Sequence, residues 1–282
     1  MKSIVYFLFL FVALQARAQS EHPSFRVELS GKGKPVILIP GYTCSGEVWK
    51  ETVAHLQARY ECHVVTLAGY AGVAPVDTPL LKTAKNELIQ YAEGLKGGRP
   101  VLIGHSLGAF LSLWMASEKP ALFDRVVCVD GLPFLSALNN PAITADSLIG
   151  KPQYDPALVS KQFLSIPDSG YVEQMTRAML FQVSDTVRAR QIAGWSYRGD
   201  RLTQALSLLE IATTDLRSAI AKITAPVLVL GSNYGSEEKS YTLLEQQYKQ
   251  LPQKKIVVAV NSKHFIMYDQ PTWMYAQIDQ FL

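Results

Sequence analysis

The stretch Val101–Phe110, VLIGHSLGAF, decides how this chain of 282 residues is read. Its segment Gly104-His105-Ser106-Leu107-Gly108 fits the pattern G-x-S-x-G. Composition alone produces such a match in roughly one chain of this length in ten, so the motif needs its surroundings. An apolar run predicts a strand over Pro100–Ile103, and a helical pattern covers Ser106–Glu118. We therefore expect Ser106 on a tight turn between a buried strand and a helix.

Short apolar runs alternate with longer amphipathic segments on both sides of this turn. The other predicted strands are Phe25–Leu29, Val36–Ile39, Cys62–Leu67, Val126–Val129, Pro226–Leu230 and Lys255–Val260. The other predicted helices are Glu47–Arg59, Thr78–Leu95 with Thr78 as N-cap and Pro79 as its first residue, Glu237–Leu251 and Thr272–Leu282. Continuous apolar strands between helices indicate an α/β fold, with a mostly parallel central sheet covered by helices on both faces. The turn Gly31–Pro35 predicts that the first two strands form an antiparallel hairpin.

The interval 133–223 interrupts this alternation. It is rich in helix formers, carries scattered aromatic residues and contains no convincing strand. It enters after the carboxyl end of one strand and returns before the next, which is where open α/β sheets bind ligands. We expect a helical lid over 133–223, inserted into a core formed by 19–132 and 224–282.

The N-terminus has the pattern of a signal peptide. Met1-Lys2 supplies a positive start, Ile4–Leu14 is almost wholly apolar, and Ala16-Arg17-Ala18 is a small-x-small cleavage site. The apolar run is shorter than the ~20 residues that a membrane span needs. We expect cleavage after Ala18 and an exported protein, periplasmic or secreted, that does not stay inserted in a membrane.

Charge and cysteine content exclude several classes of partner. The formal net charge is +3 and the basic residues are scattered, which argues against a nucleic-acid surface. Of Cys44, Cys62 and Cys128, at least one must lack an intramolecular partner, and whether Cys44 and Cys62 pair is left open. No Cys and His spacing resembles a metal site, so we expect no metal.

A nucleophilic serine needs a base from elsewhere in the chain. His22 lies near the cleavage site, His55 on a predicted helix and His63 at the start of a predicted strand. The turn directs the side chain of His105 away from Ser106. His264 stands in Asn261–Phe265, a loop that follows the last predicted strand. We expect His264 to be the base.

Four segments together resemble the α/β-hydrolase family, from Phe25 to Leu282. They are Ile39-Pro40-Gly41-Tyr42, with Pro40 where the family usually has His, the Gly-rich loop Leu67–Gly72, the turn Gly104–Gly108, and the histidine loop Ser262–Phe265. The resemblance implies that the backbone N–H groups of Tyr42 and Leu107 form an oxyanion hole. Because these donors belong to the main chain, Pro40 should matter little.

The acidic partner of the histidine departs from the commonest family pattern. Many members carry it in a Gly-x-x-Asp turn, but here that turn reads Gly231-Ser232-Asn233-Tyr234. Asp130 ends the strand Val126–Val129, where pancreatic-type lipases have their acid. We expect Asp130 to be the acid. Glu237 or Glu238 is the alternative, although a position at a helix start explains both without catalysis; Asp200 and Asp215 are more remote candidates.

These residues predict a serine hydrolase that cleaves a carboxylic ester or related acyl bond through an acyl-enzyme, without a cofactor. The substrate would be a small molecule with a hydrophobic acyl or aryl group. Thioesterase, acyltransferase, lactonase, carbon–carbon hydrolase and peptidase activities use the same constellation and stay open, as does a non-catalytic ligand-binding protein. Ser106 excludes the epoxide hydrolases and haloalkane dehalogenases of this family, which need Asp at that position.

Overall fold

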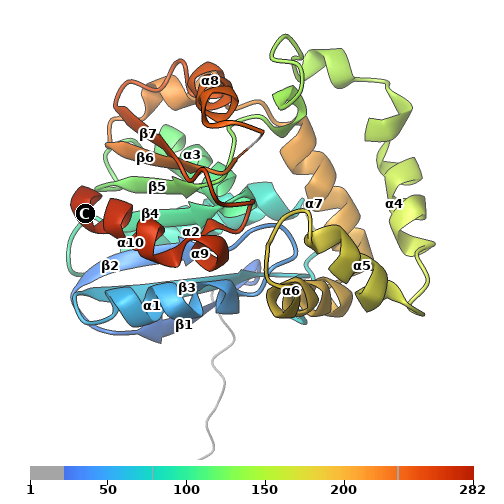
Figure 1. Ribbon diagram of the computed structural model, residues 1–282, viewed down its shortest axis with the longest axis horizontal. Coiled ribbons are helices and arrows are strands. Elements are labelled where there is room, and N and C mark those ends of the chain that lie inside the picture. Colours follow the sequence, from blue (N-terminus) through green and yellow to red (C-terminus); the bar gives the residue numbers. More distant parts are fainter. Residues whose placement is uncertain (1–21, 78, 234) are drawn as a thin grey trace, which may run out of the picture.

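The fold is built on one sheet of seven strands. The computed structural model describes residues 22–77, 79–233 and 235–282. The strand order is β1-β3-β2-β4-β5-β6-β7, in which β1 is antiparallel to β3 and every other pair is parallel (Figure 1). The strands are β1 (Phe25–Ser30), β2 (Lys34–Ile39), β3 (Tyr60–Leu67), β4 (Val101–His105), β5 (Val126–Val129), β6 (Val227–Gly231) and β7 (Lys254–Val258). The predicted α/β class with a mostly parallel sheet is confirmed.

The predicted hairpin between the first two strands is wrong. β3 lies between them, with Phe25 of β1 opposite Leu67 and Val36 of β2 opposite Cys62. The connection from β1 to β2 crosses the start of β3, where a Cβ on Gly31 would overlap the carbonyl of Tyr60. The glycines that suggest a hairpin therefore permit a close crossing of a third strand.

Helices cover both faces of this sheet. Those of the core are α1 (Lys50–Leu56), preceded by the short 3-10 helix Gly46–Trp49, and α2 (Leu80–Gly94), α3 (Leu107–Glu118), α8 (Glu237–Gln247), α9 (Ile266–Asp269) and α10 (Pro271–Phe281). Pro79 is the N-cap of α2 rather than its first residue, and the predicted cap Thr78 lies outside the described residues.

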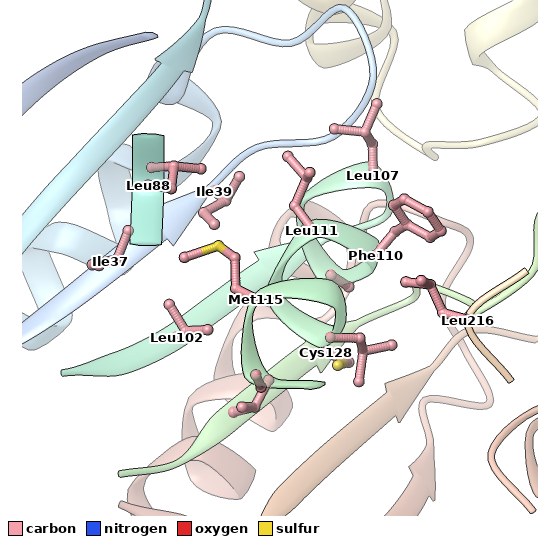
Figure 2. Close-up of a cluster of buried hydrophobic side chains, with 14 of the residues drawn as sticks. Ile37, Ile39, Leu88, Leu102, Leu107, Phe110, Leu111, Met115, Cys128 and Leu216 are labelled. Carbon is pink, nitrogen blue, oxygen red and sulfur yellow. The ribbon is translucent and has the colours of Figure 1, made fainter. Parts of the chain in front are cut away.

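The side chains of β2 alternate between two apolar clusters. Ile37 and Ile39 belong to the cluster under α2, α3 and α8, whereas Val36 and Leu38 belong to the cluster under α1, α9 and α10. Figure 2 shows Ile37 and Ile39 beside side chains of α2 and α3. The strand is buried on both faces, as its continuous apolar sequence predicts.

Residues 133–223, here called the insertion, stand between β5 and β6 and contain no strand. The helices of the insertion are α4 (Pro156–Leu164), α5 (Tyr171–Met179), α6 (Thr186–Arg198) and α7 (Arg201–Thr213), with four 3-10 turns, Leu135–Ala137, Asp146–Leu148, Pro152–Tyr154 and Ala219–Lys222. The group lies at one end of the sheet, beside the core (Figure 1). This location is the carboxyl end of the parallel strands, because the insertion leaves from the end of β5.

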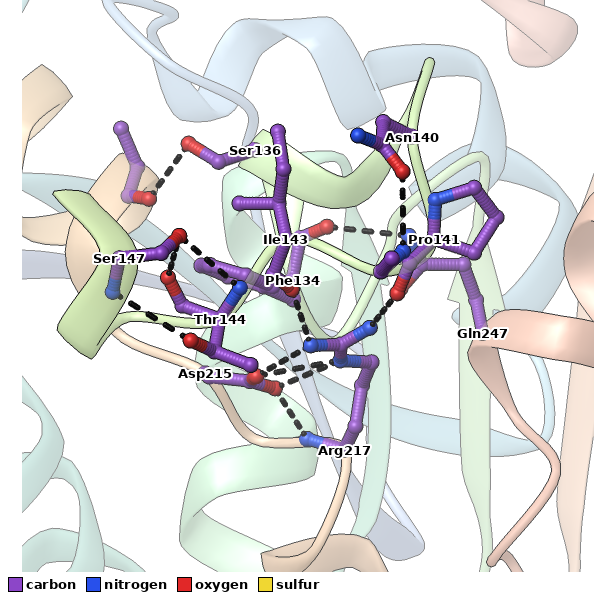
Figure 3. Close-up of polar contacts among 12 residues, drawn as sticks. Phe134, Ser136, Asn140, Pro141, Ile143, Thr144, Ser147, Asp215, Arg217 and Gln247 are labelled. Carbon is purple, nitrogen blue, oxygen red and sulfur yellow. Dashed lines mark hydrogen bonds and ion pairs between the residues drawn. The ribbon is translucent and has the colours of Figure 1, made fainter.

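Arg217 ties the two ends of the insertion together (Figure 3). Its guanidinium donates to the carbonyls of Pro141 at 2.7 Å and Ile143 at 2.6 Å, and pairs with Asp215 at 2.6 Å. Gln247 of α8 donates to the carbonyl of Phe134 at 3.1 Å, and this bond attaches the start of the insertion to the core. Both ends of the insertion are therefore held by side-chain hydrogen bonds.

The predicted signal peptide, residues 1–18, lies outside the described residues, so export stays a prediction. Within the described ranges, no helix is both long and apolar enough to span a membrane. Cys44, Cys62 and Cys128 are buried free thiols, so Cys44 and Cys62 do not pair.

Candidate active site

Ser106 occupies the turn between β4 and α3 and has a strained backbone. Its φ of 52° and ψ of −114° are sparsely populated by residues with a side chain. The flanking glycines make the turn possible: a Cβ on Gly104 would overlap the backbone of Gly108, and a Cβ on Gly108 would overlap the carbonyl of Ile39. The first turn of α3 thus lies directly against the strand ends, and Ser106 projects from this crossing.

The structure brings His264 and Asp130 together. His264 follows β7 in the loop before α9, and its Nδ1 lies 2.6 Å from Oδ2 of Asp130, which follows β5. The Asp130 side chain is fully buried, whereas that of His264 is 26% exposed. With Nδ1–H donated to the carboxylate, the neutral ring keeps Nε2 free as a proton acceptor.

Ser232, at the end of β6, holds the Asp130 carboxylate in place. Its backbone N–H donates to Oδ1 at 2.7 Å, and its hydroxyl donates to Oδ2 at 2.8 Å. Oδ2 therefore accepts from both Ser232 and His264. These bonds satisfy a buried carboxylate that would otherwise be costly to desolvate.

The other acidic candidates lie elsewhere and have local roles. Glu237 and Glu238 are exposed in the first turn of α8, where a carboxylate favours the helix dipole. Asp200 caps α7 by accepting from the backbone of Thr203 at 2.7 Å, and Asp215 pairs with Arg217. Among the described residues, Asp130 is the acidic side chain that forms a hydrogen bond or ion pair with His264.

Three of the other histidines also have separate partners. Nε2 of His55 lies 3.0 Å from Asp279, and His63 contacts Tyr91 at 2.6 Å and Glu61 at 2.9 Å. His22 stacks on Phe25. None of these three rings lines the cavity that contains Ser106.

His105 is close to the site, but its side chain binds a backbone carbonyl. Its ring centroid is 4.6 Å from that of His264, and its Nε2 donates to the His264 carbonyl at 3.2 Å. Complete burial, and then the nearby His264, hold the pKa of His105 well below its usual range. His105 is therefore a neutral ring that fixes the main chain of the histidine loop.

Ser106, His264 and Asp130 line one cavity of about 490 Å³. Tyr42 lines it as well, and Leu107 is the first residue of α3, where backbone N–H groups have no partner inside the helix. Cys44 is also in the wall, but burial raises the pKa of its thiol to about 12. A protonated thiol is a weak nucleophile, so Ser106 is the better-placed attacking group.

The insertion supplies much of the cavity wall and is anchored near it. The hydroxyl of Tyr42 donates to the Gln204 carbonyl of α7 at 2.8 Å. Asp269 accepts from the backbone N–H groups of Ser184 and Lys263, both at 2.9 Å, and so joins the insertion to the histidine loop. Phe181 is 87% exposed and also lines the cavity, which places it at the mouth.

The alpha/beta hydrolase family model matches residues 36–277. The chain belongs to the alpha/beta hydrolase family. A pimeloyl-(acyl-carrier protein) methyl ester esterase of Aeromonas hydrophila is 24% identical to this hydrolase over 274 residues, which is 92% of this chain and 99% of the relative. The enzyme of the same name from Vibrio atlanticus is 26% identical over 209 residues, 72% and 76% of the two chains.

Solved structures support the same fold for this hydrolase. The enol-lactonase of Burkholderia xenovorans superposes with a TM-score of 0.73 at 13% identity, covering 91% of this chain and 95% of the other. An esterase of Exiguobacterium antarcticum gives 0.73 at 16% identity, covering 91% and 94%. Because the identities are this low, these superpositions show a shared architecture and nothing more.

Sequence reasoning missed two supports of this hydrolase's site. Ser232 and Asp269 are common polar residues whose importance comes from partners distant in the chain. Left-handed backbone at Thr43 (φ 59°) and Asp130 (φ 45°), both in the cavity wall, was equally absent from the predictions. Neither residue is a glycine, so the usual local signal for this conformation is missing.

Proposed function

We propose that this hydrolase cleaves carboxylic esters, with Ser106 as nucleophile, His264 as general base and Asp130 as the acid that orients it. The carrying observation is the 2.6 Å contact between His264 and the buried Asp130, in the same cavity as the strained Ser106. Ester hydrolysis is favoured over other acyl transfers because the relatives above are named methyl ester esterases.

The chemistry proceeds in two halves. Nε2 of His264 takes the proton of Ser106 as Oγ bonds to the ester carbonyl carbon, and the same proton passes to the alcohol as its C–O bond breaks. Water then attacks the acyl-enzyme, gives a proton to His264, and Ser106 is regenerated as the acid leaves. Asp130 stabilises the imidazolium in both halves.

Backbone N–H groups of Tyr42 and Leu107 stabilise the oxyanion. Tyr42 is in the cavity wall and Leu107 directly follows Ser106 at the start of a helix, whose dipole favours negative charge. The insertion is the lid of this site. Its helices α5, α6 and α7 contribute Met175, Ile192 and Leu208 to the wall, which keeps water away from the acyl group.

A fluorophosphonate probe tests the proposal. The protein should label rapidly, and Ser106→Ala should abolish labelling and ester hydrolysis. Ser218→Ala removes an exposed serine outside the cavity and should change neither. Folded protein that neither labels nor hydrolyses esters would instead support a non-catalytic ligand-binding role.

A further inference from the structure

The exposed charge in the cavity wall is a cation. Of the described residues that line the cavity, Asp130 and Lys263 have charged side chains. The Asp130 side chain is fully buried and bonded to His264 and Ser232, whereas Lys263 is exposed. A charged group on a substrate therefore meets the ammonium of Lys263 rather than the carboxylate of Asp130.

The ammonium of Lys263 has no anionic partner among the described residues. Its Nζ donates to the carbonyl of Leu180 at 2.6 Å and lies 3.5 Å from that of Val183. Asp269 accepts from the backbone N–H of Lys263 and not from its ammonium. Because a lysine ammonium has three donors and both of its acceptors here are neutral, it can still bind an anion.

Gln182 brings a second donor to the segment that this ammonium binds. The Gln182 carbonyl accepts from the backbone N–H of Phe265 at 3.1 Å, so residues 180–183 of the insertion run along the histidine loop. The Gln182 side chain lines the cavity, and within the described ranges its amide has no hydrogen-bond partner. An ammonium and an amide together can donate to both oxygens of a carboxylate.

The two parts of a bound ester face different walls. In the proposed mechanism His264 protonates the departing alcohol, so the alcohol part lies on the side of the histidine loop, which also carries Lys263. The acyl part, which becomes bonded to Ser106, is left with the aliphatic side of the cavity. That side is formed by residues that follow β5 and by residues of α7, namely Leu132, Leu135, Leu138, Leu208 and Ile211.

We propose that Lys263 and Gln182 form a subsite for a carboxylate carried on the alcohol part of the ester. The preferred substrates are then esters of an apolar carboxylic acid with a hydroxy acid. The proposal rests on the function proposed above and names its substrate class. The carboxylate gains charge-assisted hydrogen bonds at the subsite, and these offset the loss of its water.

Three esters of matched length test the subsite: propyl hexanoate, the hexanoyl ester of β-hydroxypropionate, and monopropyl adipate. The first is neutral, the second carries its carboxylate on the alcohol part, and the third carries it on the acyl part. We expect kcat/KM for the hexanoyl ester of β-hydroxypropionate to exceed that for propyl hexanoate by ~10-fold. Monopropyl adipate should show no such gain.

The outcomes separate the subsite from the esterase function. Equal hydrolysis of the first two esters, or a preference for monopropyl adipate, would overturn the subsite while leaving the esterase function intact. Folded protein that hydrolyses none of the three would contradict the esterase function, and the subsite with it.

Variants at the subsite should change the ratio of the anionic to the neutral ester. Lys263→Met should lower this ratio by ~10-fold, and Gln182→Glu should lower it as well, because the new carboxylate competes for the ammonium. Lys161→Met, an exposed position on α4 outside the wall, is the matched control and should keep the wild-type ratio. A wild-type ratio in both subsite variants would contradict the proposal.

Added salt tests the same point on the unaltered protein. Raising NaCl from about 0.05 M to about 0.5 M should lower the ratio several-fold, because salt screens an exposed charge pair. A purely structural role of Lys263 in joining the insertion to the histidine loop would not make the ratio depend on salt. A ratio that stays constant would therefore overturn the subsite even if the variants fail to fold.

Discussion

The ends of β5 and β6 lie side by side and differ in what they contribute. β5 is followed by Asp130, a buried carboxylate that contacts His264, and β6 is followed by Ser232, a buried hydroxyl that contacts the same carboxylate. Parallel neighbours deliver the residues that follow them to the same edge of a sheet. One strand end therefore supplies the proposed acid and the other supplies the hydroxyl that contacts it.

The second strand end carries a hydroxyl where a second carboxylate would be unfavourable. Ser232 lies within hydrogen-bond distance of both carboxylate oxygens of Asp130. A carboxylate at position 232 would place two like charges together in a buried site, which costs free energy. A hydroxyl donates a hydrogen bond to Oδ2 instead.

The largest effect is expected from Asp130→Asn. The amide no longer stabilises the imidazolium and favours the wrong tautomer of His264, so kcat should fall by about 10⁴-fold. Steady-state kinetics measure the loss, and circular dichroism checks that the fold is kept. Near-normal turnover would remove Asp130 from the proposed triad.

A smaller effect is expected from Ser232→Ala. The variant keeps the N–H bond to Oδ1 but loses the hydroxyl bond to Oδ2, and one hydrogen bond to a charged group corresponds to about 10-fold in kcat. KM should stay the same, since Ser232 orients Asp130 rather than the substrate. Ser232→Thr retains the hydroxyl and should restore the rate. If the alanine variant turns over at the wild-type rate, the Ser232 hydroxyl does not contribute to catalysis.

The smallest effect is expected from Glu237→Gln. This carboxylate is exposed at the start of α8 and does not line the cavity, so kcat/KM should stay within about twofold of wild type. Glu238→Gln should behave alike. A large loss of kcat/KM in either variant, with little loss in Asp130→Asn, would show that the acid is Glu237 or Glu238, which follow β6, and not Asp130.

Much of the fold and part of the site could be predicted because their signals are local. The apolar run before Ser106, the helical pattern after it and the two glycines are neighbours in the chain, and the structure places Ser106 between β4 and α3 as expected. The failed hairpin shows the limit. All three strands β1, β2 and β3 were predicted, but their order in the sheet was not. β3 lies between β1 and β2 in the sheet, although it begins at Tyr60, after both of them in the chain.

The sequence by itself determined the order of strands and helices, the turn that carries Ser106 and the loop that carries His264, because periodicity and turn residues act over a few positions. Only the tertiary structure decided which carboxylate meets the histidine and what supports it. Asp130 and His264 are 134 positions apart, and Asp130 and Ser232 are 102 apart. Such contacts exist only once β5, β6 and β7 have paired, because the sheet brings their carboxyl ends to one edge.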